Sequence, residues 1–196
     1  TPEMRERYLP QNPWVDHVTT PRNGDIVSYR EDYGDSLLDS ISDSIRVLVV
    51  EDYNATGLVG DTDMLFPNEN NEGDFDQETK DNTFFWFMRS RGAQRPQAGR
   101  GGSWGLGKLA FPLASAVRTF FVVTTREDGS RYLSGQTILK PHQVHGKMFG
   151  EIMYFADEDL IISDKHGESE HFWKPISDSN AIDEFCDTFK LNRNSD

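Results

Sequence analysis

The chain has 196 residues, which is enough for a single domain with a core of its own. Its formal net charge of −13 disfavours nucleic acid or an anionic membrane as the main partner, because both require a basic surface. No apolar run approaches the roughly 18 residues that a membrane-spanning helix needs. The single cysteine, Cys186, excludes an internal disulfide framework and suits a reducing compartment, so we expect a cytoplasmic domain.

The first part of the chain alternates between irregular and periodic segments. Residues 1–33 are rich in Pro, Asn, Asp and Arg, which predicts surface loops with at most one edge strand. From Asp35 to Ile45 the apolar residues recur at helical spacing, which predicts a short amphipathic helix. The run "RVLVVED" at 46–52 is apolar and β-branched, and it predicts a buried strand that ends in an acidic loop.

Residues 61–100 form a long insertion. Between Asp61 and Asp81 lie eight acids and one lysine, and an arginine-rich half follows the aromatic stretch "FFWF". The acids lack the regular spacing of a calcium loop, so a solvated face is the better interpretation. Outside "FFWF" the segment has too few apolar residues to fold by itself. We therefore expect a mobile lid over a site, with a plain solvated loop as the alternative.

The second half of the chain carries most of the predicted strands. "KLAFPLASAVR" predicts a helix that starts at a glycine turn, with Pro112 tolerated near its first turn. "TFFVVTTRE", "YLSGQTIL" and "MFGEIMYFA" predict strands, the first two joined by the turn "DGSR". Ile182, Phe185, Cys186 and Phe189 predict a terminal amphipathic helix with the cysteine in the core. The pattern indicates an α+β fold, with helices on one face of a mixed sheet.

A P-loop is one interpretation of the glycine-rich segment near residue 105. Gly102 to Lys108 satisfies G-x-x-x-x-G-K, but the next residue should be Ser or Thr, whose hydroxyl holds magnesium. That residue is Leu109, and the preceding "SRGAQRPQAGRGG" does not have the pattern of a strand. We therefore reject the P-loop.

Two motifs together indicate a different nucleotide site. "LVVEDYNATGLVG" followed by "GSWGLGK" resembles the GHKL ATPases, the superfamily of gyrase, the heat-shock chaperone, the histidine kinases and the mismatch-repair ATPase. In that family a strand delivers an aspartate and a glycine turn that recognise adenine, and a second glycine-rich turn begins a helix. The resemblance covers about Val47 to Thr125, with two extra residues between acid and glycine. It implies a two-layer, Bergerat-like ATP-binding fold with a mostly antiparallel sheet, and Mg-ATP as ligand.

The resemblance assigns the adenine contacts to residues of suitable chemistry. An ionised carboxylate only accepts hydrogen bonds, so Asp52 suits the exocyclic amine of adenine, and Gly57 lets the backbone approach the base. The family also has a threonine on a later strand that bridges to this acid. Thr124 and Thr125 are the candidates, and because side chains alternate along a strand only one can face the site. We favour Thr125; a plain turn-capping role is the alternative for Asp52.

The phosphates are assigned to the second turn. Gly105, Leu106 and Gly107 would present backbone N–H groups at a helix N-terminus, where the dipole favours anions. Lys108 adds a mobile positive charge for the β- or γ-phosphate. Tight-turn glycines without a ligand and a solvated lysine are the alternatives.

One family motif is not found. Hydrolysis in the family depends on a helix reading roughly E-x-x-x-N-x-x-D, upstream of the adenine aspartate. "ERYLPQNPWVD" has the wrong spacing, and its two prolines would break a helix. The catalytic base is therefore unknown, and we expect hydrolysis only in a longer parent chain, since this one starts abruptly at Thr1. Other domains of that chain or a second subunit would bind the closed lid. The alternative function is a non-enzymatic interaction module that keeps the fold without nucleotide turnover.

His142 and His145 have a spacing that could ligate a metal. No cysteine or acid stands near them in the sequence, so ordinary histidines are the better interpretation.

Overall fold

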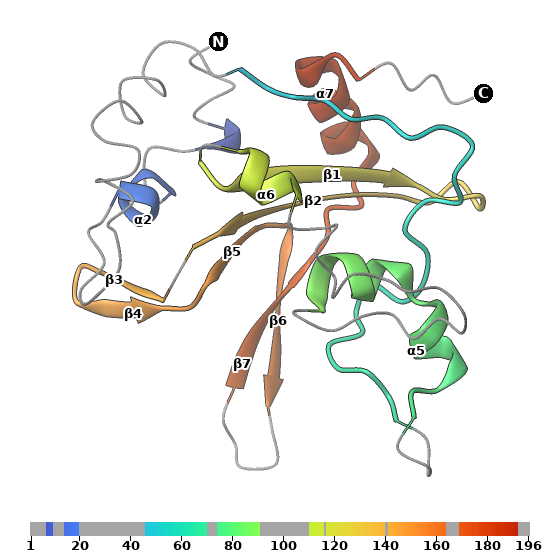
Figure 1. The fold of residues 1–196 in the computed structure, drawn as a ribbon, viewed down its shortest axis with the longest axis horizontal. Helices are drawn as coiled ribbons and strands as arrows, with labels where there is room; N and C mark the ends of the chain where they lie inside the picture. Colours follow the sequence, from blue (N-terminus) through green and yellow to red (C-terminus); the bar gives the residue numbers. More distant parts are fainter. Residues whose placement is uncertain are drawn as a thin grey trace.

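The computed structural model describes residues 7–9, 14–19, 46–69, 74–90, 110–115, 117–139, 141–163 and 169–191. Its centre is an antiparallel sheet of order β1–β2–β5, made of β1 (Thr119–Thr125), β2 (Arg131–Ile138) and β5 (Ile152–Phe155). Two hairpins lie beside it (Figure 1), β3 (His142–Val144) with β4 (Lys147–Phe149), and β6 (Glu158–Ser163) with β7 (Ser169–Lys174). The mixture of helices and antiparallel strands that the sequence predicts is confirmed.

The hairpin of β1 and β2 follows from its sequence. Both strands are rich in β-branched and aromatic residues, which suit a pleated surface. Between them Gly129 takes a φ of 82°, and the Asp128 carboxylate accepts hydrogen bonds from the backbone N–H and the hydroxyl of Ser130. Arg126 N donates to Ser130 O at 2.9 Å and closes the turn. Both predicted strands are therefore confirmed, together with their turn.

The C-terminal helix α7 (Ser179–Phe189) covers one face of the sheet. The Asp178 carboxylate accepts a hydrogen bond from Ala181 N at 2.8 Å, which caps its first turn. The main core lies between α7 and the sheet, and its buried members are Tyr8, Leu133, Ile182, Phe185 and Cys186. The predicted terminal helix and the core position of its cysteine are confirmed.

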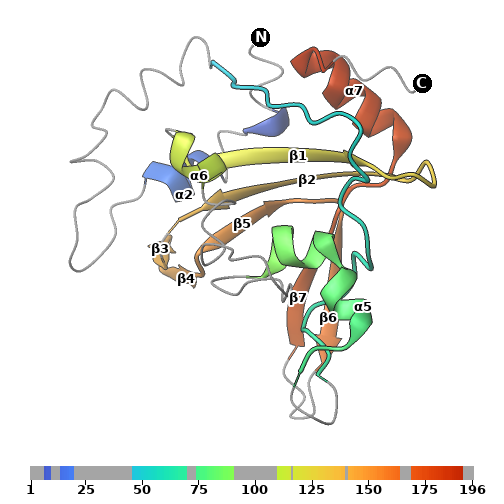
Figure 2. The same ribbon diagram turned by 45° about the vertical axis from the view of Figure 1, so that its right-hand side comes forward.

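The opposite face of the sheet is covered by shorter helical segments (Figure 2), η2 (Phe85–Arg89) and α6 (Ala110–Ala114). The Gln136 amide donates to Met88 O at 2.5 Å, and the rings of Phe111 and Phe120 lie 6.1 Å apart. Described helices thus contact both faces, whereas the sequence placed them on one face. The two-layer arrangement remains a prediction.

The insertion is folded where the structure describes it. Asp76 Oδ1 accepts from Thr79 N at 2.7 Å and caps α5 (Gln77–Asp81). Met64, Phe85 and Trp86 form a small buried core, and Trp86 Nε1 donates to Thr79 O at 2.7 Å. The expectation that this segment cannot fold is wrong for 61–69 and 74–90, because its aromatic stretch packs on the acidic half. Residues 91–100 lie outside the described residues.

The N-terminal residues pack on the far end of the sheet through α2 (Asp16–Thr19) and the residues before it. Trp14 and Val18 are buried with Leu9 and Leu139, and Trp14 Nε1 donates to Thr137 Oγ1 at 3.0 Å. The helix predicted over 35–45 lies outside the described residues. Within the described ranges no helix has the length and apolar character needed to cross a membrane.

The strand predicted over 46–52 is wrong. Residues 46–56 form no strand, and the exposed fractions of Val47, Leu48, Val49 and Val50 are 55%, 78%, 41% and 67%. An apolar β-branched run becomes a buried strand only when another strand pairs with it. Among the described residues β1 pairs with β2 alone, and no ladder includes 46–52.

Candidate functional site

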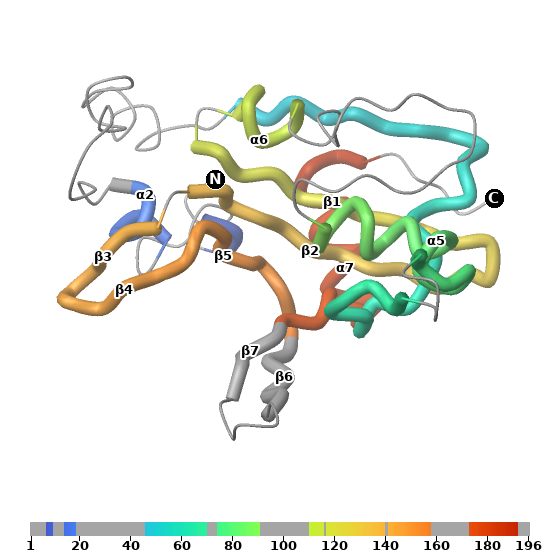
Figure 3. The backbone as a smooth tube through the Cα atoms, turned by 60° about the horizontal axis from the view of Figure 1, so that its bottom comes forward, coloured from blue at the N-terminus to red at the C-terminus, as the bar shows by residue number. Residues whose placement is uncertain are grey.

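The segment Gly57–Gly60, which we call the glycine turn, lies at the C-terminal end of β1. All three views show the cyan segment that contains it passing the β1–β2 hairpin on its way to α5 (Figure 3). Leu58 N donates to Thr124 Oγ1 at 2.7 Å. Gly57 has a φ of 72°, and a Cβ on it would lie 2.3 Å from Thr125 O. Only glycine allows the turn to approach the strand this closely.

Arg126 joins the glycine turn to the sheet. Its Nε donates to Leu58 O at 2.8 Å, and its Nη2 donates to Gly60 O at 2.7 Å. The guanidinium carbon lies 4.5 Å from the centre of the Tyr132 ring on β2, where the negative face of the ring attracts the cation. One side chain therefore satisfies two backbone carbonyls of the turn and is itself oriented by an aromatic ring.

The insertion holds the glycine turn from the other side. Val59 N donates to Thr83 Oγ1 at 2.8 Å, and Val59 O accepts from Phe84 N at 3.0 Å. Gly60 has a φ of 104°, and a Cβ on it would lie 2.4 Å from the Asn82 side chain. Asn82 is fully buried, and its amide donates to Asp61 O at 2.8 Å. The turn is thus fixed between the β1–β2 hairpin and the start of η2.

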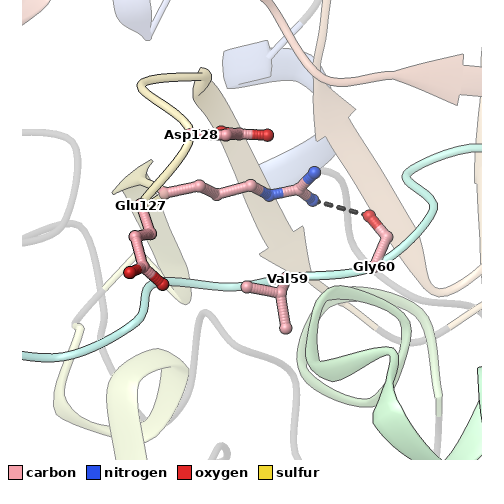
Figure 4. A pocket seen from close by; sticks show the side chains of 5 residues that line it. Val59, Gly60, Glu127 and Asp128 are labelled. Atoms are coloured by element: carbon pink, nitrogen blue, oxygen red, sulfur yellow. Dashed lines mark hydrogen bonds between the residues drawn. The ribbon is translucent and has the colours of Figure 1, made fainter.

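An open depression of about 430 Å³ lies beside the glycine turn, lined by Val59, Gly60, Arg126, Glu127 and Asp128 (Figure 4). The dashed line in Figure 4 marks the bond from Arg126 to Gly60 O. Hydrogen bonds from the hydroxyl and backbone N–H of Ser130 lower the pKa of the Asp128 carboxyl, which is therefore ionised at neutral pH. Two acids and one arginine suit an uncharged or basic group better than a polyphosphate.

The predicted adenine residues fall in two places. Gly57 lies against the threonine-bearing end of β1, and the hydroxyl that contacts the turn belongs to Thr124, which is 4% exposed. Thr125 points its side chain to the other face of the strand, although its carbonyl meets Gly57. Asp52 lies on the exposed stretch before the turn, and its side chain is exposed. Its role in binding adenine remains a prediction, as does that of Thr125.

The predicted phosphate residues Gly105, Leu106, Gly107 and Lys108 lie outside the described residues. Arg126, Asn82 and Thr83 were not among the predicted site residues. Arg126 lies inside the predicted strand "TFFVVTTRE", whereas β1 ends at Thr125, so the sequence pattern did not single it out. Asn82 and Thr83 belong to the insertion, which was predicted to be a mobile lid rather than a support for the turn.

A second cluster of polar residues lies at the far end of the sheet. His17 Nδ1 on α2 and His142 Nε2 on β3 are 2.7 Å apart, and both side chains are buried. His145 Nε2 lies 3.2 Å from Asp16 Oδ2, so an acid that is distant in sequence is close in space. In the described part of the chain, no group of three or more His, Cys, Asp or Glu residues is arranged to hold a metal. A magnesium ion carried by ATP therefore remains a prediction.

Comparison of the chain with protein-family models, with curated proteins and with solved structures gives no match. The resemblance to the GHKL ATPases therefore depends on the two glycine motifs of this sequence, and the function drawn from it is a proposal.

Proposed function

We propose that this chain is the ATP-binding domain of a GHKL-type ATPase, which binds Mg-ATP and uses closure of residues 61–100 as a conformational switch. The observation that supports the proposal is the contact of the glycine turn with the threonine-bearing end of β1. Leu58 and Thr124 are 66 residues apart in sequence, yet they share a hydrogen bond. The resemblance expects a threonine on a later strand to bridge to the adenine-binding acid, and here a threonine of β1 bonds the turn that follows this acid in the sequence.

In this proposal each motif binds one part of the nucleotide. Asp52 accepts from the exocyclic amine of adenine, and the glycine turn lies under the base. The segment Gly105–Lys108 binds the phosphates, because the acids beside the glycine turn would repel them. The full two-layer, Bergerat-like arrangement belongs to the same proposal. The proposal covers binding of Mg-ATP, and it names no catalytic base for hydrolysis because the Glu/Asn helix is not identified in this sequence.

The test is the choice between adenine and guanine nucleotides. By calorimetry we expect ATP and ADP to bind more tightly than GTP, which has a carbonyl where adenine has its amine. Asp52→Asn should weaken ATP about tenfold or more, because a hydrogen bond to a charged group is worth about 1.5–3 kcal/mol. It should also reduce the preference for ATP, since an amide donates as well as accepts. The matched control is Glu51→Gln, an exposed neighbour on the same stretch. Equal affinity of the wild-type chain for ATP and GTP would contradict the proposal.

A second function is favoured by a different observation. The stretch Val47–Val50 has four consecutive exposed apolar residues, and such side chains can contact a partner. A non-enzymatic interaction module that keeps the fold without nucleotide turnover would use it, with another domain of the parent chain or a second subunit as partner. If ATP, ADP and GTP all fail to bind, the interaction module becomes the better conclusion.

A further inference from the structure

We infer that Arg126 is a positioning residue for the nucleotide base, which presets the glycine turn without contacting the phosphates; this inference rests on the proposed function. Arg126 bonds the two carbonyls on either side of Val59, at 2.8 Å and 2.7 Å. A planar guanidinium has its donors in a fixed fork. Both carbonyls must therefore point toward the same side chain, and Arg126 holds this part of the turn in a curved conformation.

The orientation of Arg126 is itself constrained. The Tyr132 ring lies under the guanidinium at 4.5 Å, and the backbone of Arg126 is tied into the hairpin through its N–H bond to Ser130 O. Pre-organisation of this kind raises affinity because less conformational freedom is lost when the ligand binds. The turn is therefore already ordered when the base binds.

The surroundings of Arg126 do not favour binding of a phosphate. Two of its donors are engaged by the carbonyls of the glycine turn, and Glu127 and Asp128 line the same depression. These two acids offset the positive charge that a phosphate would need. Geometry, rather than charge, is therefore the property of Arg126 that matters for binding.

Positioning of the turn and direct contact with phosphate predict different effects of Arg126→Lys and Arg126→Ala on nucleotide affinity. Arg126→Lys keeps the charge, but a single ammonium does not reproduce the fork on both carbonyls. If Arg126 positions the turn, Arg126→Lys and Arg126→Ala should both weaken ATP, ADP and adenosine by the same factor, about tenfold. The matched control is Arg131→Lys, because Arg131 contacts Asp183 on α7 and is the next arginine along the hairpin.

The experiment combines calorimetry of ATP, ADP and adenosine with hydrogen exchange of the backbone amides of Leu58 and Val59. In Arg126→Lys we expect equal losses for the three ligands and faster exchange at both amides, with neither change in Arg131→Lys. A loss that is larger for ATP than for adenosine and is restored by lysine would show a phosphate contact and overturn the inference. Unchanged affinity in Arg126→Ala would overturn it as well.

Failure of the proposed function gives a distinct result. If the proposed function is wrong, the wild-type chain binds neither ATP nor adenosine, and Arg126 then has no base-positioning role either. If the wild-type chain binds and the Arg126 variants bind equally well, the inference alone fails and the proposed function stands.

Discussion

His17 and His142 meet inside the protein, with His17 Nδ1 2.7 Å from His142 Nε2. The two rings are nearly perpendicular, and Phe149 packs 4.5 Å from the His17 ring. One of the two facing nitrogens must offer a lone pair for this hydrogen bond, so His17 Nδ1 and His142 Nε2 cannot both be protonated in this geometry. The contact between α2 and the β3–β4 hairpin therefore depends on protonation.

This pair predicts a loss of stability in acid. Burial lowers the pKa of His17 from its ordinary 6.5, the charges of His142 and His145 lower it further, and Asp16 opposes them. The unfolded chain then binds the proton more tightly. The free energy of unfolding should be unaffected by His17 above pH 6.5 and should fall as the pH decreases below that value. Urea titrations across this range should show a flatter pH dependence in His17→Gln. An unchanged slope in His17→Gln would contradict the prediction.

Thr124 should matter more than Thr125 for the glycine turn. Thr124→Val removes the acceptor of Leu58 N, and leaving a part-buried N–H without its partner typically costs about 1–3 kcal/mol. Thr125→Val changes the other face of β1 and is the matched control. Urea unfolding measures the difference in stability, and calorimetry with ATP shows which threonine nucleotide binding needs. Equal effects of the two substitutions on stability would argue against a specific role of the Thr124 hydroxyl.

Lys108→Ala should separate phosphate binding from base binding. Only ATP carries the charge that a lysine at a helix N-terminus attracts, so ATP should weaken about tenfold or more while adenosine is unchanged. Calorimetry with both ligands checks this, and Lys147→Ala, an exposed lysine on β4, is the control. If both ligands weaken by the same factor, Lys108 has a structural role and "GLGK" does not bind phosphate.

Limited proteolysis should reveal whether the insertion responds to nucleotide. We expect trypsin to cut the free protein at Arg91 and Arg100, whereas Arg95 is followed by Pro96, and trypsin does not cleave an Arg–Pro bond. Arg89 should resist, because it donates to Thr62 O and its partial burial lowers its pKa to about 10, which leaves it charged and bonded at neutral pH. Mg-ATP should protect these two sites, and ADP should protect them less, because a ligand shifts the closure equilibrium only by its differential affinity. Cleavage that is indifferent to ATP would favour the interaction module.

The sequence predicted the elements whose residues form a clear local pattern, but not which strands would pair. Runs of β-branched and aromatic residues joined by the turn "DGSR" predicted β1 and β2, and helical spacing predicted α7. "MFGEIMYFA" was predicted as a strand but splits into β4 and β5 around Gly150, since β4 pairs with β3 and β5 pairs with β2. Nothing in the sequence of "MFGEIMYFA" indicates that its two halves pair with different strands.

The candidate site was less predictable for the same reason. The motif indicated Gly57, but the residues that fix its turn are long-range partners, among them Thr124 and Arg126. Val47–Val50 has a strand-like composition, yet composition does not specify whether a partner strand is available. Asn82 and Thr83 are polar residues in an acidic insertion, and their burial depends on a neighbour that only folding provides.

The bonds from the glycine turn to β1 also set an order of events during synthesis. Leu58 and Gly60 emerge from the ribosome before Thr124 and Arg126, and their hydrogen bonds span 66 to 68 residues. Contacts of such sequence separation form late, because the intervening chain must first be ordered. Until the β1–β2 hairpin is made, the nascent chain presents Val47–Val50 without the anchor that follows it. Until Thr124 and Arg126 have been synthesised, the exposed Val47–Val50 stretch therefore precedes a turn without its anchor, and the nascent chain can aggregate or bind a chaperone there.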